Sequence, residues 1–261
     1  MRRALALLCA LTGALTAASA GADDAALLLK LLQRAQRQEL RGQVVSSVYF
    51  PPRPNPDRRL NTLPAVRFVP WLLKKNFDVT LAGSDRVADR DAQRYELSPK
   101  AGSGARWTLW LDLQTQLPLG FAERGADGTL VRQAQFVKVN GGAKRRLSPL
   151  VSVPRDPSFR AAVLAALPGL KIPKGFEPIS YQQRDRGPEV VLSDGVNVLA
   201  LVIAGRPVKP APGVAVRPVG AGWLWLVGNL PQGELDAALK SVRSISLDAL
   251  GTFSPDSVSQ Q

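Results

Sequence analysis

The chain has 261 residues, with 34 lysines and arginines against 21 aspartates and glutamates, no histidine and one cysteine, and 45% of its residues are apolar. Without histidine, a Ser-His-Asp or Cys-His catalytic site and a histidine-ligated metal site are excluded. The apolar fraction is large enough for a packed core, which argues against a disordered chain.

Residues 1–20 have the pattern of a secretory signal peptide: Arg2-Arg3, then small and apolar residues, then Ala18-Ser19-Ala20 as a cleavage site. The apolar run is shorter than the roughly 20 residues that span a bilayer. Cys9 would leave with the signal, so the mature chain would hold no disulfide or thiol site. We therefore expect a periplasmic or otherwise extracytoplasmic protein that is peripheral to a membrane at most.

The net charge of +13 bears on the partner. In a cytosolic protein it would suggest nucleic acid. In an exported protein it favours anionic lipid head groups, acidic cell-wall polymer or an acidic protein segment, and we expect no nucleic-acid partner. A solvated basic surface that keeps the protein soluble is the alternative.

The first expected elements are a helix and a strand. Asp23 and Asp24 can cap a helix, and apolar residues then recur at helical spacing from Leu28 to Ala35. Residues 42–50 are β-branched and aromatic, which predicts a strand.

The next stretch is interrupted by prolines. Residues 51–59, PPRPNPDRR, hold four prolines and are expected to be irregular. Residues 62–75 show a helical pattern that is broken at Pro64 and Pro70.

A series of antiparallel strands is expected after the prolines. An Asp127-Gly128 pair between two alternating runs predicts a tight hairpin turn. The expected strands are residues 77–81, 85–89, 93–97, 105–113, 119–123 and 130–139.

Residues 141–146, GGAKRR, break the sheet pattern, and a short helix is expected over 158–167. A second set of strands follows, and Pro231 then opens a helix with Leu235, Ala238 and Leu239 on one face. The expected strands of this set are residues 177–182, 189–192, 196–203, 214–217 and 223–227.

The order of elements predicts an α+β protein in two domains, because it lacks the βαβ alternation of a parallel nucleotide-binding sheet. The predicted parts are a signal peptide (1–20), a first domain (21–140), a linker with a short helix (141–168), a smaller domain of antiparallel sheet plus C-terminal helix (169–250) and a disordered tail (251–261).

Short turn and strand motifs recur through both expected domains. In the first they are Phe77-Asp78-Val79, Arg94-Tyr95-Glu96-Leu97, Trp110-Leu111-Asp112, Gln116-Leu117-Pro118 and Phe136-Val137-Lys138-Val139. In the second they are Ile172-Pro173-Lys174-Gly175-Phe176, Leu192-Ser193-Asp194-Gly195 and Val227-Gly228-Asn229-Leu230-Pro231. In this order they resemble the sigma-E factor regulatory proteins of the RseB/MucB type, which share a fold with the lipoprotein carrier LolA.

The resemblance implies an open, antiparallel LolA-like half-barrel over helices, with an apolar concave face, and a smaller domain beside it. Such proteins are exported, are not enzymes, and bind the extracytoplasmic part of a membrane-spanning anti-sigma factor. Lipid-like ligands are proposed to occupy the concave face and release that hold. Members carry several long strands before the region of Phe77, where this chain shows one strand and the proline-rich segment, so a shortened half-barrel with a smaller cavity is expected.

Two sets of side chains are candidate binding sites. An apolar concave face would be lined by Trp71, Phe77, Trp107, Trp110, Phe121 and Phe136, for which ordinary core packing is the alternative. A basic cluster of Lys144, Arg145 and Arg146 would attract an acidic partner, unless it is merely solvated. Asp112 is expected to cap backbone amides in a turn.

The leading hypothesis is an exported binding protein that regulates an extracytoplasmic-stress sigma factor by holding an anti-sigma factor, with a possible lipid or acyl-chain ligand. The alternative is a LolA-like carrier of lipidated proteins or anionic lipids. An enzyme is the third hypothesis, and no pair of carboxylates at a suitable spacing supports it. No cofactor or metal is expected.

Overall fold

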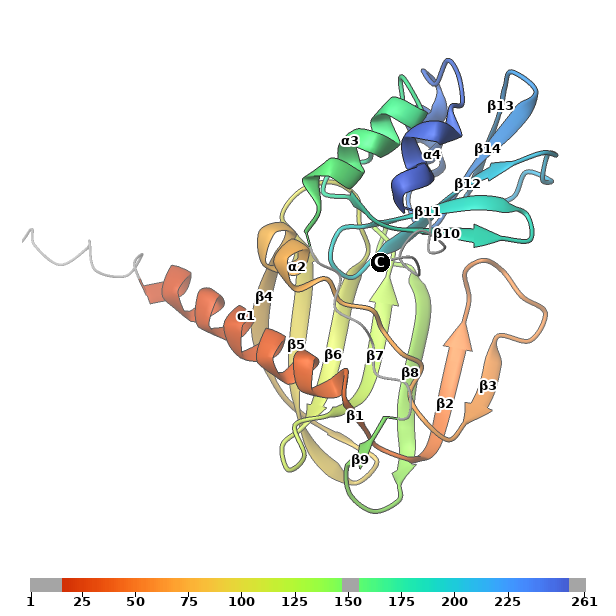
Figure 1. Ribbon diagram of the computed structural model, residues 1–261. Coiled ribbons are helices and arrows are strands. Elements are labelled where there is room, and N and C mark those ends of the chain that lie inside the picture. Colours follow the sequence, from red (N-terminus) through yellow and green to blue (C-terminus); the bar gives the residue numbers. More distant parts are fainter. Residues whose placement is uncertain (1–15, 147–154, 254–261) are drawn as a thin grey trace, which may run out of the picture.

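The computed structural model describes residues 16–146 and 155–253. They form a seven-stranded and a five-stranded sheet, each with its own helices, and a small two-stranded ribbon (Figure 1). The first 15 residues of the predicted signal peptide, and residues 254–261 of the predicted tail, lie outside the described residues. None of the described helices is both long and apolar enough to cross a membrane.

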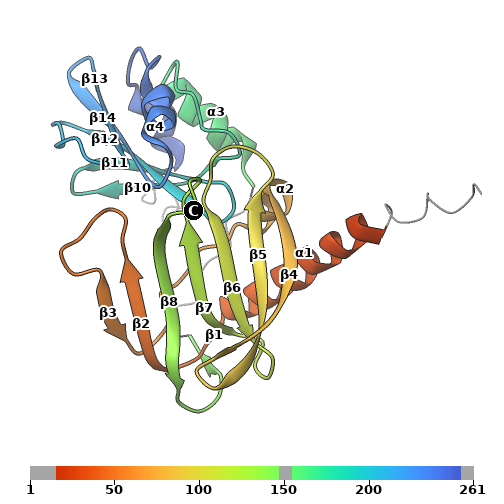
Figure 2. The same cartoon turned by 180° about the vertical axis from the view of Figure 1, so that it is seen from behind.

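The larger sheet is antiparallel throughout and open, in the order β3-β2-β8-β7-β6-β5-β4. Helix α1 lies across one face of the curved sheet, and the view from behind shows that no helix covers the other face (Figure 2). The expected open half-barrel over a helix is therefore confirmed. Its strands are β2 Gly42–Val48, β3 Asp57–Leu60, β4 Phe77–Val87, β5 Arg90–Pro99, β6 Arg106–Asp112, β7 Pro118–Arg124 and β8 Leu130–Val139.

The predicted hairpin between β7 and β8 is confirmed, and residues of the turn itself stabilise it. Gly128 has φ of +82°, which a residue without Cβ adopts at little cost. The Asp127 carboxylate accepts hydrogen bonds from the Thr129 amide at 2.9 Å and the Thr129 hydroxyl at 2.7 Å. The turn sets the register in which Phe121 faces Ala134 across the strands.

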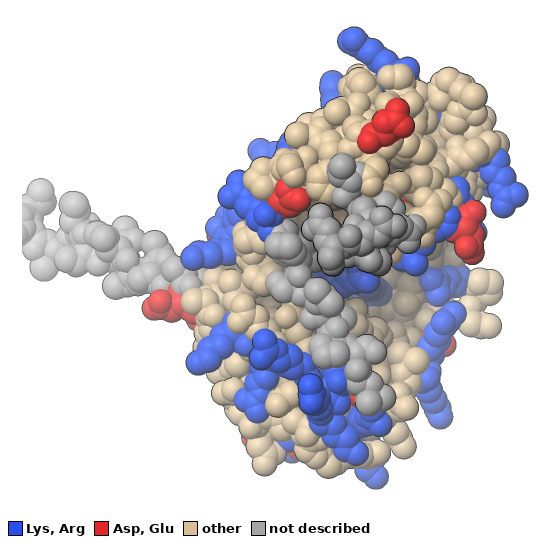
Figure 3. All heavy atoms as spheres, viewed as in Figure 1, with Lys and Arg blue, Asp and Glu red and all other residues tan. Residues whose placement is uncertain are grey.

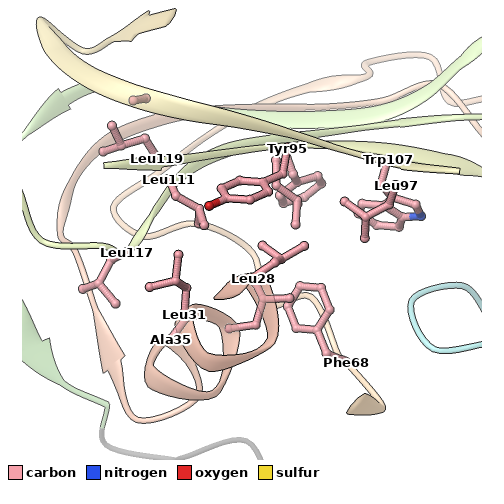
Figure 4. Close-up of a cluster of buried hydrophobic side chains, with 14 of the residues drawn as sticks. Leu28, Leu31, Ala35, Phe68, Tyr95, Leu97, Trp107, Leu111, Leu117 and Leu119 are labelled. Atoms are coloured by element: carbon pink, nitrogen blue, oxygen red, sulfur yellow. The ribbon is translucent and has the colours of Figure 1, made fainter. Parts of the chain in front are cut away.

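The first core lies between the concave face of the sheet and helix α1, Thr16–Ala35. Figure 4 shows Leu28, Leu31 and Ala35 of the helix pointing towards the sheet. Opposite them, the alternation of the strands places every second side chain on the core face. The strand residues labelled in the figure are Tyr95, Leu97, Trp107, Leu111 and Leu119, and Leu117 lies just before β7; all are at most 2% exposed.

Two N-terminal expectations were wrong. Helix α1 begins at Thr16, before the two aspartates, because the alanine-rich stretch around them has high helix propensity. Asp24 therefore does not cap the helix; its carboxylate accepts a hydrogen bond from the Leu81 amide at 2.9 Å. In the segment expected to be helical over 62–75, the helix α2, Pro70–Asn76, begins only at the second proline, which occupies the first turn.

The proline-rich segment was expected to be irregular, and for its last three residues this was wrong. Asp57–Leu60 form strand β3, which pairs with β2 in the register Val44 to Leu60. Hydrogen bonds to the neighbouring strand stabilise β3, although its local sequence does not favour a strand. The sheet thus has two strands before Phe77, where one was expected.

The three short strands expected over 77–97 are two long ones. The register shifts between Leu81 and Ser84, and Gly83 lies there with φ of +111°, so the glycine marks a β-bulge and not the end of a strand. The turn to β5 is made by Ala88 and Asp89, which both have positive φ.

The smaller sheet has the order β10-β11-β12-β14-β13, and its five strands lie where the sequence predicted them. Helices α3, α4 and η1 pack with it in a second core. The elements are α3 Pro157–Ala166, β10 Glu177–Arg184, β11 Gly187–Ser193, β12 Val198–Ala204, β13 Val214–Val219, β14 Gly222–Val227, α4 Gln232–Leu239 and η1 Leu247–Phe253.

Two boundaries of the smaller domain differ from the sequence-based expectation. Helix α3 was assigned to the linker, but Phe159 and Val163 are buried in the second core. Residues 251–253, assigned to a disordered tail, belong to η1, and the ring of Phe253 lies 5.0 Å from that of Phe159. Apolar side chains on both segments find partners that are distant in sequence.

The two cores meet at the turn between β11 and β12. Val196 lies in this turn but is buried, 2% exposed, in the core of the larger sheet. The Val69 amide donates to the Gly195 carbonyl oxygen at 2.9 Å. A Cβ on Gly195, whose φ is +127°, would lie 2.5 Å from the Leu73 nitrogen. The smaller domain thus inserts a turn into the larger one at van der Waals contact.

We expect Val196→Ala to lower the free energy of unfolding by about 2 kcal/mol, because two buried methyl groups are lost and a cavity remains. The control is Val198→Ala, two residues later in β12, where the side chain is 42% exposed; the loss there should stay under about 1 kcal/mol. Urea unfolding measures both. Equal losses in the two variants would contradict the insertion of Val196 into the core.

Candidate functional site

An apolar pocket lies between the concave face, the C-terminal end of α1 and residues 63–68. The space left open inside it is about 40 Å³, far below the roughly 300–1,000 Å³ of typical ligand pockets. Helix α1 and residues 63–68 fill the concave side and leave this small cavity. Its apolar lining comprises Leu32, Ala35, Leu40, Leu63, Pro64, Val66, Phe68, Leu109, Leu117, Pro118, Phe121 and Phe136.

Three of the six predicted apolar site residues lie in the core near this pocket. Phe121 and Phe136 line it directly. Phe77 is 2% exposed in the same core but does not line the pocket. For these three, core packing describes the environment completely.

The three tryptophans differ in their surroundings. Trp110 is half-buried and alternates with the core residues of β6, and its indole N–H donates to Asp85 at 2.7 Å. Trp71 is half-buried under the guanidinium of Arg155, which lies 5.6 Å from its ring centre. Trp107 is buried in the same core as the phenylalanines, with its ring centre 5.6 Å from that of Phe121, and its indole N–H reaches the smaller domain. Four of the six predicted residues are therefore buried in one core, whereas Trp71 and Trp110 are only half-buried.

The basic residues predicted as a partner site form part of a ribbon. Residues 141–146 were expected to break the sheet, but β9, Lys144–Arg145, pairs antiparallel with β1, Gln38–Glu39. The side chains of Lys144 and Arg145 are exposed. This ribbon closes the end of α1 and the mouth of the apolar pocket, to which Glu39 and Arg146 both contribute.

Arg146 differs from its two neighbours. Its guanidinium makes a salt bridge to Glu39 at 3.4 Å and donates to the Ala35 carbonyl oxygen at 3.0 Å. Its backbone amide donates to the Arg37 carbonyl oxygen at 2.9 Å. Arg146 therefore caps the last carbonyls of α1, as a basic residue at a helix C-terminus does.

The junction between the domains holds polar residues that were not predicted. The Trp107 indole N–H donates to Asn197 Oδ1 at 2.8 Å, and Asn197 Nδ2 donates to the Ala105 carbonyl oxygen at 3.1 Å. Asn76 Nδ2 donates to the carbonyl oxygens of Gly175 and Asp194, at 2.7 and 2.8 Å. Each amide side chain bridges the two domains, and breaking such a buried bond leaves a polar group unsatisfied.

A second polar contact joins the domains through Glu123. Its buried carboxylate is held by Arg132 and accepts a hydrogen bond from Asn229 Nδ2 at 3.1 Å. The Arg132 guanidinium also lies 5.0 Å from the ring centre of Trp107. The strand motifs of the sequence contained Asp194 and Asn229, but nothing local showed that they face the other domain.

The prediction for Asp112 is confirmed. Its carboxylate accepts from the Thr115 amide at 3.0 Å and makes a two-pronged pair with Arg90, at 2.9 and 3.1 Å. The pair is buried on the Asp112 side and fixes the turn after β6.

Burial raises the pKa of Asp194 above its ordinary value of 3.8, although hydrogen bonds from Asn197 and Val196 act in the opposite direction. The carboxylate is 3% exposed, and its Oδ1 accepts from both backbone amides. The junction thus contains a group whose charged form is disfavoured by its surroundings.

Comparison with known proteins finds a matching family model and similar sequences. Residues 24–155 match the family model of the MucB/RseB N-terminal domain. The sigma-E factor regulatory protein RseB of Escherichia coli K12 is 26% identical over 176 residues, which cover 60% of this chain and 54% of RseB. RseB of Salmonella typhimurium is likewise 26% identical, over 62% of this chain and 55% of that protein. The chain thus spans about half the length of the curated relatives it matches.

Solved structures show the same fold. The crystal structure of MucB superposes with a TM-score of 0.59 at 19% identity, covering 85% of this chain and 98% of that one. The structure of MucB in complex with MucA(peri) gives 0.57 at 21% identity, covering 85% of this chain and 100% of that one. The complex of Pseudomonas aeruginosa MucA/MucB gives 0.56 at 20%, covering 85% and 99%.

We expect the stability contributed by Asp194 to fall as pH rises. The pKa of Asp194 is higher in the folded chain than in the unfolded chain, so the stability that this difference contributes is fully present below pH 3.8. It is lost progressively as the pH rises through the folded pKa. Asp194→Asn does not titrate at this position, so wild type should lose stability relative to this variant as pH rises from about 3.5 to about 7. Urea unfolding at a series of pH values measures the difference.

Asp127→Asn provides the matched control. Hydrogen bonds from Thr129 lower the pKa of this exposed carboxylate, so wild type should gain stability relative to Asp127→Asn as pH rises. Two slopes of the same sign would show that the surroundings of Asp194 do not act as described.

Proposed function

The chain belongs to the MucB/RseB family, and from this premise we propose that it is an exported regulator that binds the extracytoplasmic part of a membrane-spanning anti-sigma factor. The relatives named RseB are sigma-E factor regulatory proteins, and MucB has been solved in complex with MucA(peri). By holding such a segment, the chain would restrain the release of an envelope-stress sigma factor. The protein acts by binding and catalyses no reaction.

The observation that carries this proposal, in preference to a carrier, is the filled concave side. A carrier of lipid or of lipidated protein encloses an acyl chain, and ligand pockets typically measure about 300–1,000 Å³. The pocket here leaves about 40 Å³. A ligand would have to displace α1 or residues 63–68, whose side chains Leu32 and Phe68 are buried. A protein whose concave side is filled in this way is suited to binding through its outer surfaces.

The three buried carboxylates of the described residues favour a structural role, and one of them, Asp194, is held by two backbone amides of its own turn. Asp112 is paired with Arg90, and Glu123 is held by Arg132. A general base needs a carboxylate that is free to take a proton from a substrate. Both of these are fixed by a guanidinium and by neighbouring hydrogen bonds, which stabilise turns and the domain junction.

We further propose the organisation of the mature chain. It would begin at Gly21 after cleavage of the signal peptide, and its first domain would end at the basic ribbon. The second domain would begin with α3, Pro157–Ala166, because this helix packs in the second core. Export would place both domains on the side of the membrane where the partner's segment lies.

The test of the function uses the mature chain and the extracytoplasmic segment of the single-span anti-sigma protein from the same organism. We expect a stoichiometric complex in size-exclusion chromatography, and slower cleavage of the segment by its regulatory protease when the chain is bound. Deletion of the chain should raise expression of the envelope-stress regulon. Absence of a complex, together with an unchanged regulon, would refute the proposed function.

The carrier alternative has its own measurement. Native mass spectrometry of the protein purified from its own host should show the mass of the bare chain, because the pocket has no room for an acyl chain. A stoichiometric lipid adduct that survives desalting would instead favour the carrier. Leu32→Trp should, like wild type, show only the mass of its own bare chain in the first case, and should lose the adduct in the second.

A further inference from the structure

We propose that the basic ribbon surface, formed by Arg34, Arg37, Lys144 and Arg145, docks an acidic, extended polypeptide segment. The proposal rests on the proposed function in one respect: the segment is taken to belong to the partner held by the chain. It adds where on this chain that segment binds and what chemistry it carries.

Three segments bring the four cations together. The register of the ribbon pairs Gln38 with Arg145 and Glu39 with Lys144. The Arg34 guanidinium donates to Gln38 Oε1 at 3.0 Å, and the Arg37 carbonyl oxygen accepts from the backbone of Arg146. All four side chains are exposed. The cluster is thus a fixed feature of the fold, in which residues more than a hundred positions apart lie side by side.

The charge of this surface is uncompensated. The carboxylate within it, Glu39, is 13% exposed and is engaged by Arg41 at 3.3 Å and Arg146 at 3.4 Å. Among the residues that the structure describes, none makes a salt bridge to the four exposed cations, whereas Arg90, Arg94, Arg132 and Arg160 each have a carboxylate partner. Figure 3 shows Lys and Arg side chains gathered over the lower front, where α1 ends and the ribbon lies.

A hollow adjoins the cations and indicates a polypeptide. It measures about 520 Å³ and is lined by Gln33, Gln36 and Gln38 together with Arg34 and Arg37. Glutamine offers both donors and acceptors, whereas arginine offers donors only. An extended polypeptide presents backbone N–H and C=O groups beside its acidic side chains, which matches this mixture. A phosphodiester presents acceptors only, and would leave the carbonyls of Gln33 and Gln36 to water, while that of Gln38 already accepts from Arg34.

The surface lacks what a membrane-binding surface has. Peripheral binding to a bilayer combines basic residues with exposed apolar side chains that enter the acyl region. None of the exposed large apolar residues lies within the described residues 34–39 or 144–146. The leucines that flank residues 34–39, Leu32 and Leu40, are buried at 2% and 3% exposure. The cations therefore face a polar partner.

Charge complementarity of this kind acts mainly on the rate of encounter. Association steered by opposite charges is about a hundredfold or more faster than that of neutral surfaces, and the gain disappears as salt rises. Reversal of two cations should thus slow association strongly and change dissociation much less. The Debye length falls from about 30 Å at 0.01 M salt to about 3 Å at 1 M, which makes salt the diagnostic variable.

The experiment compares the double variant Arg37→Glu/Arg145→Glu with Arg184→Glu/Arg186→Glu. Both pairs are exposed, without a salt-bridge partner among the described residues, and both variants change net charge equally; the control pair lies at the β10–β11 turn of the other domain. Stopped-flow fluorescence measures association of each protein with the partner's extracytoplasmic segment. It is repeated with a labelled peptide of alternating Glu and Ser, and with vesicles of phosphatidylglycerol and phosphatidylcholine.

We expect association of the partner segment to slow about tenfold or more in the ribbon variant at low salt, and to change less than about twofold in the control. The difference should vanish near about 1 M salt. Wild-type rates in the ribbon variant would overturn the docking surface while leaving the proposed function intact. Equal slowing in both variants would show a general effect of net charge, and also overturn it.

Failure of the function is distinguishable from failure of the docking surface. If wild type does not bind the partner segment, the proposed function fails, and the Glu-Ser peptide decides the surface. Binding of this peptide by wild type and the control variant, with loss in the ribbon variant, supports the surface. Loss of vesicle binding alone in the ribbon variant would assign the cations to a membrane and refute a polypeptide.

Discussion

The turn at Asp194, Gly195, Val196 and Asn197 joins the two domains, and the rest of the structure depends on how it is buried. It places an apolar side chain in one core while its backbone belongs to the sheet of the other. Its polar groups are satisfied across the junction by Trp107, Val69 and Asn76. Buried hydrogen bonds of this kind contribute less to stability than to uniqueness, because any other arrangement leaves groups without partners. The two domains are therefore held in one defined arrangement.

Much of the fold was predictable because its signals are local. The Asp127-Gly128 turn and the alternation in β6, β8 and β14 lie within a few residues of each other, and the strands formed as predicted. The features that were missed are set by distant partners. Strand β3 follows four prolines and forms because β2 offers a ladder, and the two-residue strand β9 forms because β1 lies beside it. Local propensity carries no information about either neighbour.

In the candidate site, too, local features were predictable and features set by distant partners were not. The alternation along β6 correctly gave Trp107 a core position, but its hydrogen-bond acceptor is 90 positions away in the other domain. Aromatic content suggested a single lined cavity, whereas the structure divides the set among the core, the convex side and the junction. Of the basic cluster, Lys144 and Arg145 are exposed as a partner site requires, while Arg146 is used to end a helix. The topology thus places side chains of the same chemical type, aromatic or basic, in different surroundings.

The strand order of the larger sheet also governs how the chain acquires its structure. Strand β2 pairs on one side with β3, its neighbour in sequence, and on the other with β8, in the register Val44 to Phe136. Until β8 has been synthesised, the hairpin of β2 and β3 has an unpaired edge and an uncovered apolar face. Pairings of such high contact order form slowly, and exposed edges invite aggregation in the interval. A nascent chain with this topology therefore passes through an interval in which this edge is open to pairing with other chains.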